Sequence, residues 1–343
     1  MNQHICFLTM IMIIIIKEMF RNNFMGSMMT IIIVLLLSAC GTGKETSTSS
    51  TTPAATTASQ TTRTITHLKG NTVIPAKINK IVVLSAAYID HLLTIGEKPA
   101  GVNNQVRYGG DYLPYVAKQL QGVPLVGSAD KPNLEAILEI KPDVILVESR
   151  TAATTYEQLQ KIAPTIVMGN EWQEYESDVN FWKKDLMMIA EMYDKADVAK
   201  SKIAELELKV TKAREQIKKL SNKNLAYLRV REKNLQLYAQ NGHPTNVLLY
   251  HDLGFTPTAL TPKDKRVDLS MEKIPEINAD YVLLETDPNA NDYLKNLKAS
   301  PLWKNTPAVV SNKIYETDSF WLFKGWGVIG RGEIIDEILK IIK

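Results

Sequence analysis

The sequence predicts an α/β protein made of two similar lobes joined by a single long helix. From Ile65 onward, short apolar β-type runs alternate with amphipathic helical runs, as in α/β architecture. Residues 134–148 match residues 271–285 at a constant offset. A chain of 343 residues also has room for about two domains. We therefore expect an N-terminal lobe over 65–172, a linking helix over 173–195 and a C-terminal lobe over 196–343.

Expected strands and internal repeats support the two lobes. The expected strands are 80–84, 143–147, 165–168, 225–231, 281–284 and 308–310. Two further pairs of similar segments accompany the match of 134–148 with 271–285. They are Ile95-Gly96 with Leu253-Gly254, and residues 162–167 with 305–310. Each similarity is weak alone, but three repeated segments in the same order indicate two lobes of similar structure.

The linking helix is predicted from apolar spacing. Residues 177–193 carry apolar side chains at a helical period and contain no Gly or Pro. The pattern continues through residues 194–220, whose surface mixes Lys and Glu, and we assign that second segment to the start of the C-terminal lobe. A rigid helical connection predicts limited closure of the lobes.

Composition excludes several classes of protein. The chain has 40 Lys+Arg against 37 Asp+Glu, so its charge offers no general attraction for nucleic acid. Hydrophobic residues at 45% and charged residues at 22% are ordinary for a globular protein. A multi-pass membrane protein, a disulfide-stapled miniprotein and a disordered chain are excluded.

The first 64 residues predict export and anchoring. Apolar runs at 5–16 and 30–37 are shorter than a membrane-spanning helix, and the second ends in Leu37-Ser-Ala-Cys40. This ending resembles the bacterial lipobox, which implies a signal peptide over 1–39 and lipid on Cys40. We expect the true start at Met19, which would leave residues 1–18 untranslated. Residues 40–64, rich in Thr and Ser, are expected to form the lipid anchor and a disordered tether.

These elements resemble the helical-backbone class of ABC-importer substrate-binding proteins for ferric siderophores, haem and cobalamin. Residues 132–146 are the most specific stretch, and residues 228–238 and 249–254 look closest to ferric-bacillibactin-binding lipoproteins. The resemblance implies a ligand cleft between the lobes, an ABC permease dimer as partner and no cofactor of the protein's own. It also implies that Arg229 and Arg231, with Arg107 from the other lobe, hold a triscatecholate.

The residues themselves support an anion site at Arg229 and Arg231. Side chains alternate along a strand, so both arginines share one face near its carboxyl end, where ligands bind in open α/β sheets. The alternative is a solvated edge paired with Glu232. A ferric triscatecholate carries three negative charges, and the planar guanidinium suits its oxygens and rings. The further candidates for ligand contact are Trp172, Tyr238, Trp321, Trp326 and Arg331, with Tyr108, Tyr112, Phe323 and Lys324 nearby.

Glu135 and Glu272 occupy equivalent positions in the repeat, each at the start of an expected helix. An acid there complements the helix dipole, which is the ordinary explanation. The resemblance implies more, because in this family an equivalent glutamate on each lobe meets arginines of the permease. We therefore predict a docking role for both.

The sequence gives little indication of an enzyme active site or a metal site. Gly325-Trp-Gly-Val-Ile-Gly330 fits G-x-G-x-x-G, but too few residues follow it for a βαβ unit. The histidines show no metal-site spacing, and a hexadentate chelator would already fill the iron octahedron. The prediction is a monomeric, lipid-anchored receptor at the outer face of the cell membrane that delivers a ferric siderophore. A ferric hydroxamate, haem or cobalamin receptor is the alternative, and a lipid-anchored enzyme or sensor module is more remote.

Overall fold

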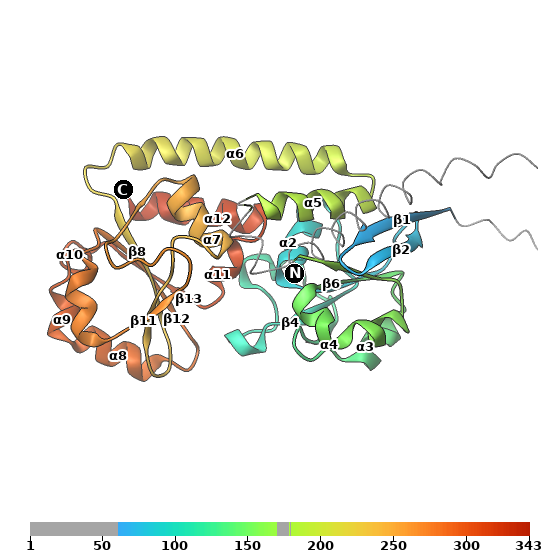
Figure 1. Ribbon diagram of the computed structural model, residues 1–343, viewed down its shortest axis with the longest axis horizontal. Helices are drawn as coiled ribbons and strands as arrows, with labels where there is room; N and C mark the ends of the chain where they lie inside the picture. The colour runs from blue at the N-terminus through green and yellow to red at the C-terminus, as the bar shows by residue number, and fades with distance from the viewer. Residues whose placement is uncertain (1–60, 170–177, 179) are drawn as a thin grey trace, which may run out of the picture. The chain divides into compact units, whose positions relative to one another are not determined.

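The computed structural model describes residues 61–169, 178 and 180–343. The predicted signal peptide, Cys40 and Trp172 lie outside these ranges. Two sheets, each covered by helices, form the two lobes (Figure 1). The α/β prediction is confirmed, and its two lobes are built on similar parallel cores.

The N-terminal lobe is a parallel five-stranded sheet of order β5-β4-β3-β6-β7, preceded by an antiparallel hairpin of β1 and β2. Every residue of β3, β6 and β7 is buried, as expected for parallel strands covered on both faces. The elements are β1 (Thr62–His67), β2 (Gly70–Pro75), β3 (Ile81–Leu84), α2 (Ala86–Thr94), β4 (Gly101–Asn104), η1 (Val106–Tyr108), η2 (Pro114–Val116), β5 (Leu125–Ser128), α3 (Leu134–Ile140), β6 (Val144–Glu148), α4 (Ser149–Gln160) and β7 (Thr165–Met168).

The C-terminal lobe has a sheet of order β11-β9-β8-β12-β13, with β10 also paired to β8. Its β8, β12 and β13 are parallel, whereas β9 and β11 are antiparallel to their neighbours. The elements are β8 (Asn224–Val230), β9 (Leu235–Leu237), α7 (Pro244–Asn246), η3 (Val247–Asp252), β10 (Thr256–Pro257), β11 (Val267–Leu269), η4 (Met271–Ile277), β12 (Tyr281–Thr286), α8 (Asn291–Ala299), α9 (Pro301–Lys304), α10 (Pro307–Val310), β13 (Ile314–Asp318), α11 (Trp321–Lys324) and α12 (Val328–Ile341).

The repeat with an offset of 137 is a structural repeat. It relates α3 to η4 and β6 to β12. Asp143 accepts hydrogen bonds from the backbone N–H groups that lead into β3, and its counterpart Asp280 does the same at the start of β8. Lys141 and Asn278 each end the preceding helix in the left-handed conformation. η4 is a 3₁₀ helix with Pro275 inside it, a residue that has no N–H to donate.

Two boundaries differ from the prediction. Residues 308–310 lie in helix α10, and the strand that occupies the position of β7 is β13, so the similarity of 162–167 to 305–310 is not structural. A proline after a short polar residue suits a helix start as well as a strand start, which explains the error. Residues 62–64 belong to β1 and not to a disordered tether, because Arg63 donates to the Asp194 carboxylate.

The long helix that runs past both lobes is α6 (Ala196–Lys218), which the sequence analysis placed inside the C-terminal lobe (Figure 1). The segment predicted to join the lobes contains α5 (Phe181–Met192), which packs against α2 and α6. Lys183 of α5 pairs with Glu207 of α6, and Lys209 of α6 pairs with Asp336 of α12. α6 therefore connects the two lobes.

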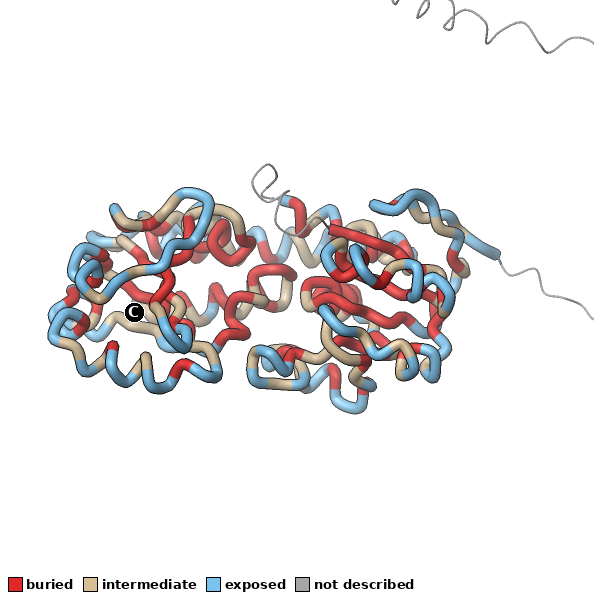
Figure 2. The backbone as a smooth tube through the Cα atoms, turned by 60° about the horizontal axis from the view of Figure 1, so that its bottom comes forward, coloured by how far each residue is buried: buried red, intermediate tan, exposed pale blue. Residues whose placement is uncertain are grey.

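One hydrophobic core continues through both lobes. It includes Val83 and Leu92 from the first lobe, Leu186 from α5, and Tyr227 and Ile335 from the second. Two smaller cores fill the other face of each sheet. Figure 2 shows the buried residues concentrated in the strands, with exposed residues on the outer helices and turns. A shared core of this kind opposes relative motion of the lobes, and limited closure stays a prediction.

Candidate functional site

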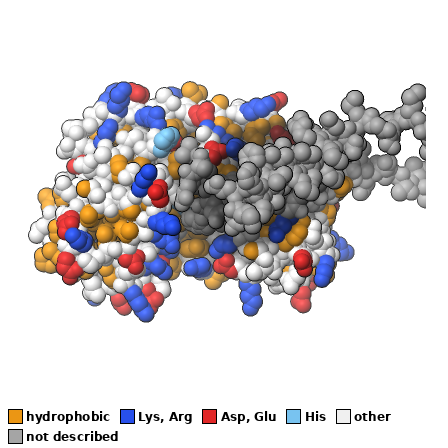
Figure 3. Space-filling model, in the orientation of Figure 1, with side chains coloured by type: hydrophobic (Ala, Val, Ile, Leu, Met, Phe, Trp, Pro, Cys, Tyr) orange, Lys and Arg blue, Asp and Glu red, His pale blue; other side chains and the backbone are white. Residues whose placement is uncertain are grey.

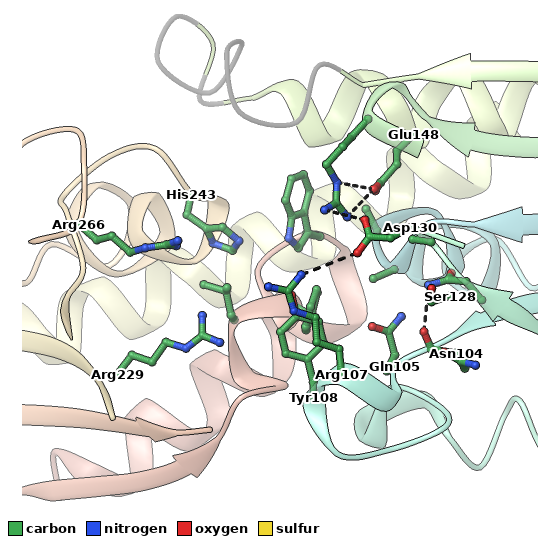
Figure 4. Close-up of a pocket in the computed structure, with 18 of the residues that line it drawn as sticks. Asn104, Gln105, Arg107, Tyr108, Ser128, Asp130, Glu148, Arg229, His243 and Arg266 are labelled. Carbon is green, nitrogen blue, oxygen red and sulfur yellow. Dashed lines mark hydrogen bonds and ion pairs between the residues drawn. The ribbon is translucent and has the colours of Figure 1, made fainter. Parts of the chain in front are cut away.

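A cavity of about 260 Å³ lies where the carboxyl ends of the strands of both lobes face each other (Figure 4). This is the edge at which ligands bind in open α/β sheets. The first lobe contributes Ala86, Ala87, Asn103, Asn104, Gln105, Arg107, Tyr108, Ser128, Ala129, Asp130, Glu148 and Arg150 to its wall. The second contributes Arg229, Arg231, His243, Arg266, Leu322, Phe323 and Trp326. The structure thus places the expected cleft between the lobes.

Arg229 and Arg231 stand at the carboxyl end of β8, as the sequence predicted, and both line the cavity. Arg229 is 12% exposed, and its Nη2 lies 2.7 Å from Oδ1 of Asp287. Arg231 is 45% exposed, and its Nε lies 3.8 Å from the other oxygen of the same carboxylate. Asp287 is not one of the residues that line the cavity, and it pairs closely with Arg229 and more loosely with Arg231.

A second carboxylate, Glu285, lies beneath Arg229 and is fully buried. It accepts hydrogen bonds from the hydroxyl groups of Tyr227 and Tyr238, and its Oε1 is 3.5 Å from Nε of Arg229. Burial raises the pKa of Glu285 to about 8, although the charge of Arg229 and the Tyr227 hydroxyl act in the opposite direction. This network holds Arg229 in one orientation.

The wall on the first lobe contains Arg107, which the sequence predicted, and Arg150, which it did not. Nη1 of Arg150 lies 3.1 Å from Oδ1 of Asp130, and Nη2 lies 3.1 Å from Oε1 of Glu148. Nη1 of Arg107 lies 3.8 Å from Oδ2 of Asp130. Arg107 comes from η1, Asp130 from the loop after β5 and Arg150 from the first turn of α4.

His243 and Arg266 complete the basic wall on the second lobe, and neither was predicted from the sequence to line the cleft. His243 caps α7 by accepting from the Thr245 N–H through Nδ1. Burial and the charge of Arg266 lower the pKa of His243 to about 3, so the ring is neutral and its Nε2 carries the proton. Arg266 forms no ion pair with another residue of the described ranges. Both residues also line an adjoining cavity of about 620 Å³.

The predicted aromatic residues divide between cavity and core. Trp326, Tyr108 and Phe323 line the cavity, and Trp326 meets His243 edge to face at 5.4 Å between ring centroids. Tyr238 lines the adjoining cavity. Tyr112 is outside both walls, and its hydroxyl donates to the Val123 carbonyl.

Two predicted contact residues, Trp321 and Arg331, lie in the core and line neither cavity. Trp321 is buried against Tyr227 and donates to Glu337, which also pairs with Lys324. Arg331 is 2% exposed, is paired with Asp252 and donates to the Gly325 carbonyl. Arg331 was predicted as a contact residue because it is close in sequence to the aromatic cluster. That closeness does not show on which face of α12 its guanidinium lies.

Two buried side-chain amides on the first lobe are chemically notable. Within the described part of the chain, Oδ1 of Asn103 and Nε2 of Gln105 have no hydrogen-bond partner, although both side chains are buried in the cavity wall. A buried polar atom without a partner costs about 1–3 kcal/mol.

Glu135 and Glu272 are exposed, each in the first turn of its helix, on α3 and η4. Hydrogen bonds from the backbone and from Ser270 lower the pKa of Glu272. Over the visible face, Lys and Arg are interspersed with Asp and Glu (Figure 3). No cluster of metal-ligating side chains and no helix long and apolar enough to span a membrane occurs in the described ranges.

The fold and the two-lobed basic cleft define a ligand-binding protein of the transporter type. The sequence profile of the periplasmic binding protein family matches residues 81–320, and the chain belongs to that family. The resemblance noted from the sequence is therefore confirmed, and the chain is a binding protein rather than an enzyme.

Three relatives illustrate the class. The Bacillus subtilis protein named "Probable siderophore-binding lipoprotein YfiY" is 30% identical over 301 residues, covering 82% of this chain and 88% of its own. The iron(3+)-hydroxamate-binding protein YxeB of the same organism is 28% identical and covers 81% and 85%. The crystal structure of the triscatecholate siderophore binding protein FeuA from Bacillus subtilis, complexed with ferri-bacillibactin, aligns with a TM-score of 0.66 at 22% identity, covering 82% and 98%. This structural similarity supports the two-lobed α/β fold.

Proposed function

We propose that this protein binds an iron(III)–siderophore complex and delivers it to an ABC permease for iron uptake. The observation that carries the proposal is the cleft wall itself, in which five arginines from both lobes face one cavity. Only two acidic residues, Asp130 and Glu148, line the same wall within the described ranges. Such a wall suits a polyanionic ligand, and the iron would arrive already coordinated by its chelator.

The favoured ligand is a triscatecholate, which carries three negative charges on an aromatic exterior. Arginine donates to its oxygens through a planar fork and stacks on its rings. Trp326, Tyr108 and Phe323 offer aromatic surface beside the arginines. The second candidate is a ferric hydroxamate, because the iron(3+)-hydroxamate-binding protein YxeB is a relative matched over 85% of its own length.

Titration of intrinsic tryptophan fluorescence tests the proposal, because Trp326 lies in the cavity wall. The titrants are ferri-bacillibactin, a ferric trihydroxamate, ferric citrate and haem. We expect saturable quenching by the triscatecholate at the lowest concentration, without turnover. Tighter binding of the neutral trihydroxamate would replace the first candidate with the second, and a response to haem alone would contradict both.

Lipid anchoring through Cys40 is the proposed means of retention at the outer face of the membrane. Cys40→Ala should release the protein into the medium or leave the precursor uncleaved, because the thiol is the acceptor for lipid. Ligand affinity should not change, since the cleft lies in residues 86–326. Labelling with a radioactive fatty acid measures the outcome, and label that persists in the variant would contradict the prediction.

Docking to a permease dimer is proposed for Glu135 and Glu272, which the repeat places at equivalent positions on the two lobes. Replacing both by arginine should impair uptake of radioactive iron in cells and leave ligand affinity unchanged, because charges at a docking rim set encounter and register. Glu139 and Glu276, one turn further along the same helices and also exposed, provide a matched double reversal. Equal uptake by the two double variants, at equal surface expression, would exclude the docking role.

A further inference from the structure

The two lobes hold their cleft arginines by different means. Arg229 and Asp287 are 12% and 13% exposed, and Asp287 is absent from the cavity wall. Arg107, Arg150 and Asp130 are 72%, 51% and 57% exposed, and all three line the cavity. Of the two first-lobe carboxylates in the wall, the exposed one is therefore Asp130, which lies beside Arg107 and Arg150, the groups that an anionic ligand would contact.

The internal repeat allows the arginine-binding carboxylates of the two lobes to be compared position by position. The offset of 137 that relates β6 to β12 also relates Glu148 to Glu285 and Arg150 to Asp287. In the second lobe both related positions are carboxylates, and they fix Arg229 from beneath. In the first lobe the second position is Arg150, and Asp130 supplies a carboxylate from the loop after β5. Figure 4 shows Asp130 directed toward Arg107.

The strength of these pairs decides which can change partner. An exposed ion pair contributes about 0–1 kcal/mol, whereas breaking a buried pair costs about 3–5 kcal/mol. The pairs of Asp130 belong to the first group, and the pair of Arg229 with Asp287 is largely buried. Asp130 can therefore leave its arginines at low cost, while Arg229 keeps its carboxylate partner.

We propose that the Asp130 carboxylate occupies, in the ligand-free cleft, the place between Arg107 and Arg150 that an anionic group of the ligand takes. Asp130 then acts as an exchangeable counter-ion and sets the charge that a ligand must carry. A polyanionic chelate gains two arginine contacts when it displaces Asp130. A neutral chelate gains little and leaves Asp130 in place. This inference rests on the proposed function and identifies a specificity-determining residue of the same site.

The test compares Asp130→Asn with the full-length parent protein. The probes are ferri-bacillibactin as the trianion and a ferric trihydroxamate as the neutral complex. We expect Asp130→Asn to bind the trianion about three- to tenfold more tightly than the parent. Most of this gain should come from a faster association rate, and the gain should disappear in high salt. Affinity for the neutral complex should stay the same. Glu139→Gln on α3 removes the same charge from an exposed position outside the cavity wall and should alter neither affinity.

The outcomes separate the two proposals. Unchanged or weaker binding of the trianion by Asp130→Asn would overturn the counter-ion role while leaving the proposed function in place. An equal gain for the neutral complex would also overturn it, because charge would not be what Asp130 selects. A parent protein that binds neither complex would overturn the proposed function, and this inference with it. Thermal unfolding of each variant shows that the comparison is made between folded proteins.

Discussion

Replacing Arg229 by alanine is expected to weaken binding of the ferric siderophore ten- to a hundredfold and to destabilise the fold. A hydrogen bond to a charged group contributes about 1.5–3 kcal/mol, and 1.4 kcal/mol corresponds to one decade of affinity. The variant also removes the cationic partner of Glu285 and leaves Asp287 with only the more distant and more exposed Arg231. Removing one member of a buried pair costs about 3–5 kcal/mol, and this should appear as a lower free energy of unfolding in urea.

Arg231→Ala is the matched control, because Arg231 lines the same cavity but is 45% exposed. It should weaken binding to a similar degree and change the free energy of unfolding by less than about 1 kcal/mol. Arg229→Lys should keep the positive charge but lose the planar fork, giving an intermediate affinity. Parent-like affinity of the double alanine variant would remove both arginines from the site.

The repeat and the strand pattern account for most of what could be predicted from sequence. The offset of 137 was visible because Asp143 and Asp280 each bind the start of a neighbouring strand, which constrains residue type at both copies. The position of the long helix was not predictable in the same way. An amphipathic period identifies a helix but does not show which lobe its apolar face contacts, and so α5 was mistaken for α6 as the connection.

The candidate site was predictable most directly where a regular strand carries it. Arg229 and Arg231 follow from strand alternation at the end of β8. His243 and Arg266 reach the cavity from irregular segments, whose course depends on tertiary contacts. Arg150 had a usable signal, since it follows β6 as Asp287 follows β12, at the repeat offset.

The glycine pattern at 325–330 is explained by packing. An ideal Cβ on Gly325 would lie 2.2 Å from the Thr245 hydroxyl, and one on Gly330 would lie 2.3 Å from the Lys324 carbonyl oxygen. On Gly327 it would lie 2.1 Å from the Asp90 carboxyl group. Gly325 and Gly330 allow close approach within the second lobe, and Gly327 allows it at the junction of the two lobes. The fit to a nucleotide-binding motif is therefore incidental.

Asp90 forms a clamp across this junction. It belongs to α2 of the first lobe and is fully buried. Its two carboxylate oxygens accept from the backbone N–H groups of Ile329 and Gly330, at 3.2 and 2.9 Å, in the first turn of α12. Gly327, at the N-cap of α12, has no side chain to cap that helix itself. A carboxylate from the other lobe thus supplies the cap.

Asp90→Asn is expected to remove a pH dependence of stability that this clamp creates. Burial raises the pKa of Asp90 to about 6, although the N–H groups of Gly330 and Ile329 oppose the shift. Because the native pKa lies above the ordinary value of 3.8, the native state binds more protons than the unfolded state between about pH 4 and 6. The contribution of Asp90 to the free energy of unfolding is therefore complete below pH 4 and is lost as the pH rises through 6.

The expected size follows from two pKa units at 1.36 kcal/mol each, which is about 3 kcal/mol. The quantity to measure is the difference in free energy of unfolding between the parent and Asp90→Asn, from urea titrations at half-unit steps from pH 4 to 7. Other carboxylates titrate alike in both proteins and cancel in this difference. The neighbouring Tyr115 does not interfere, because burial raises its pKa well above 10. A difference that stays constant over the range would mean that Asp90 is charged throughout, and that the N–H groups of α12 outweigh its burial.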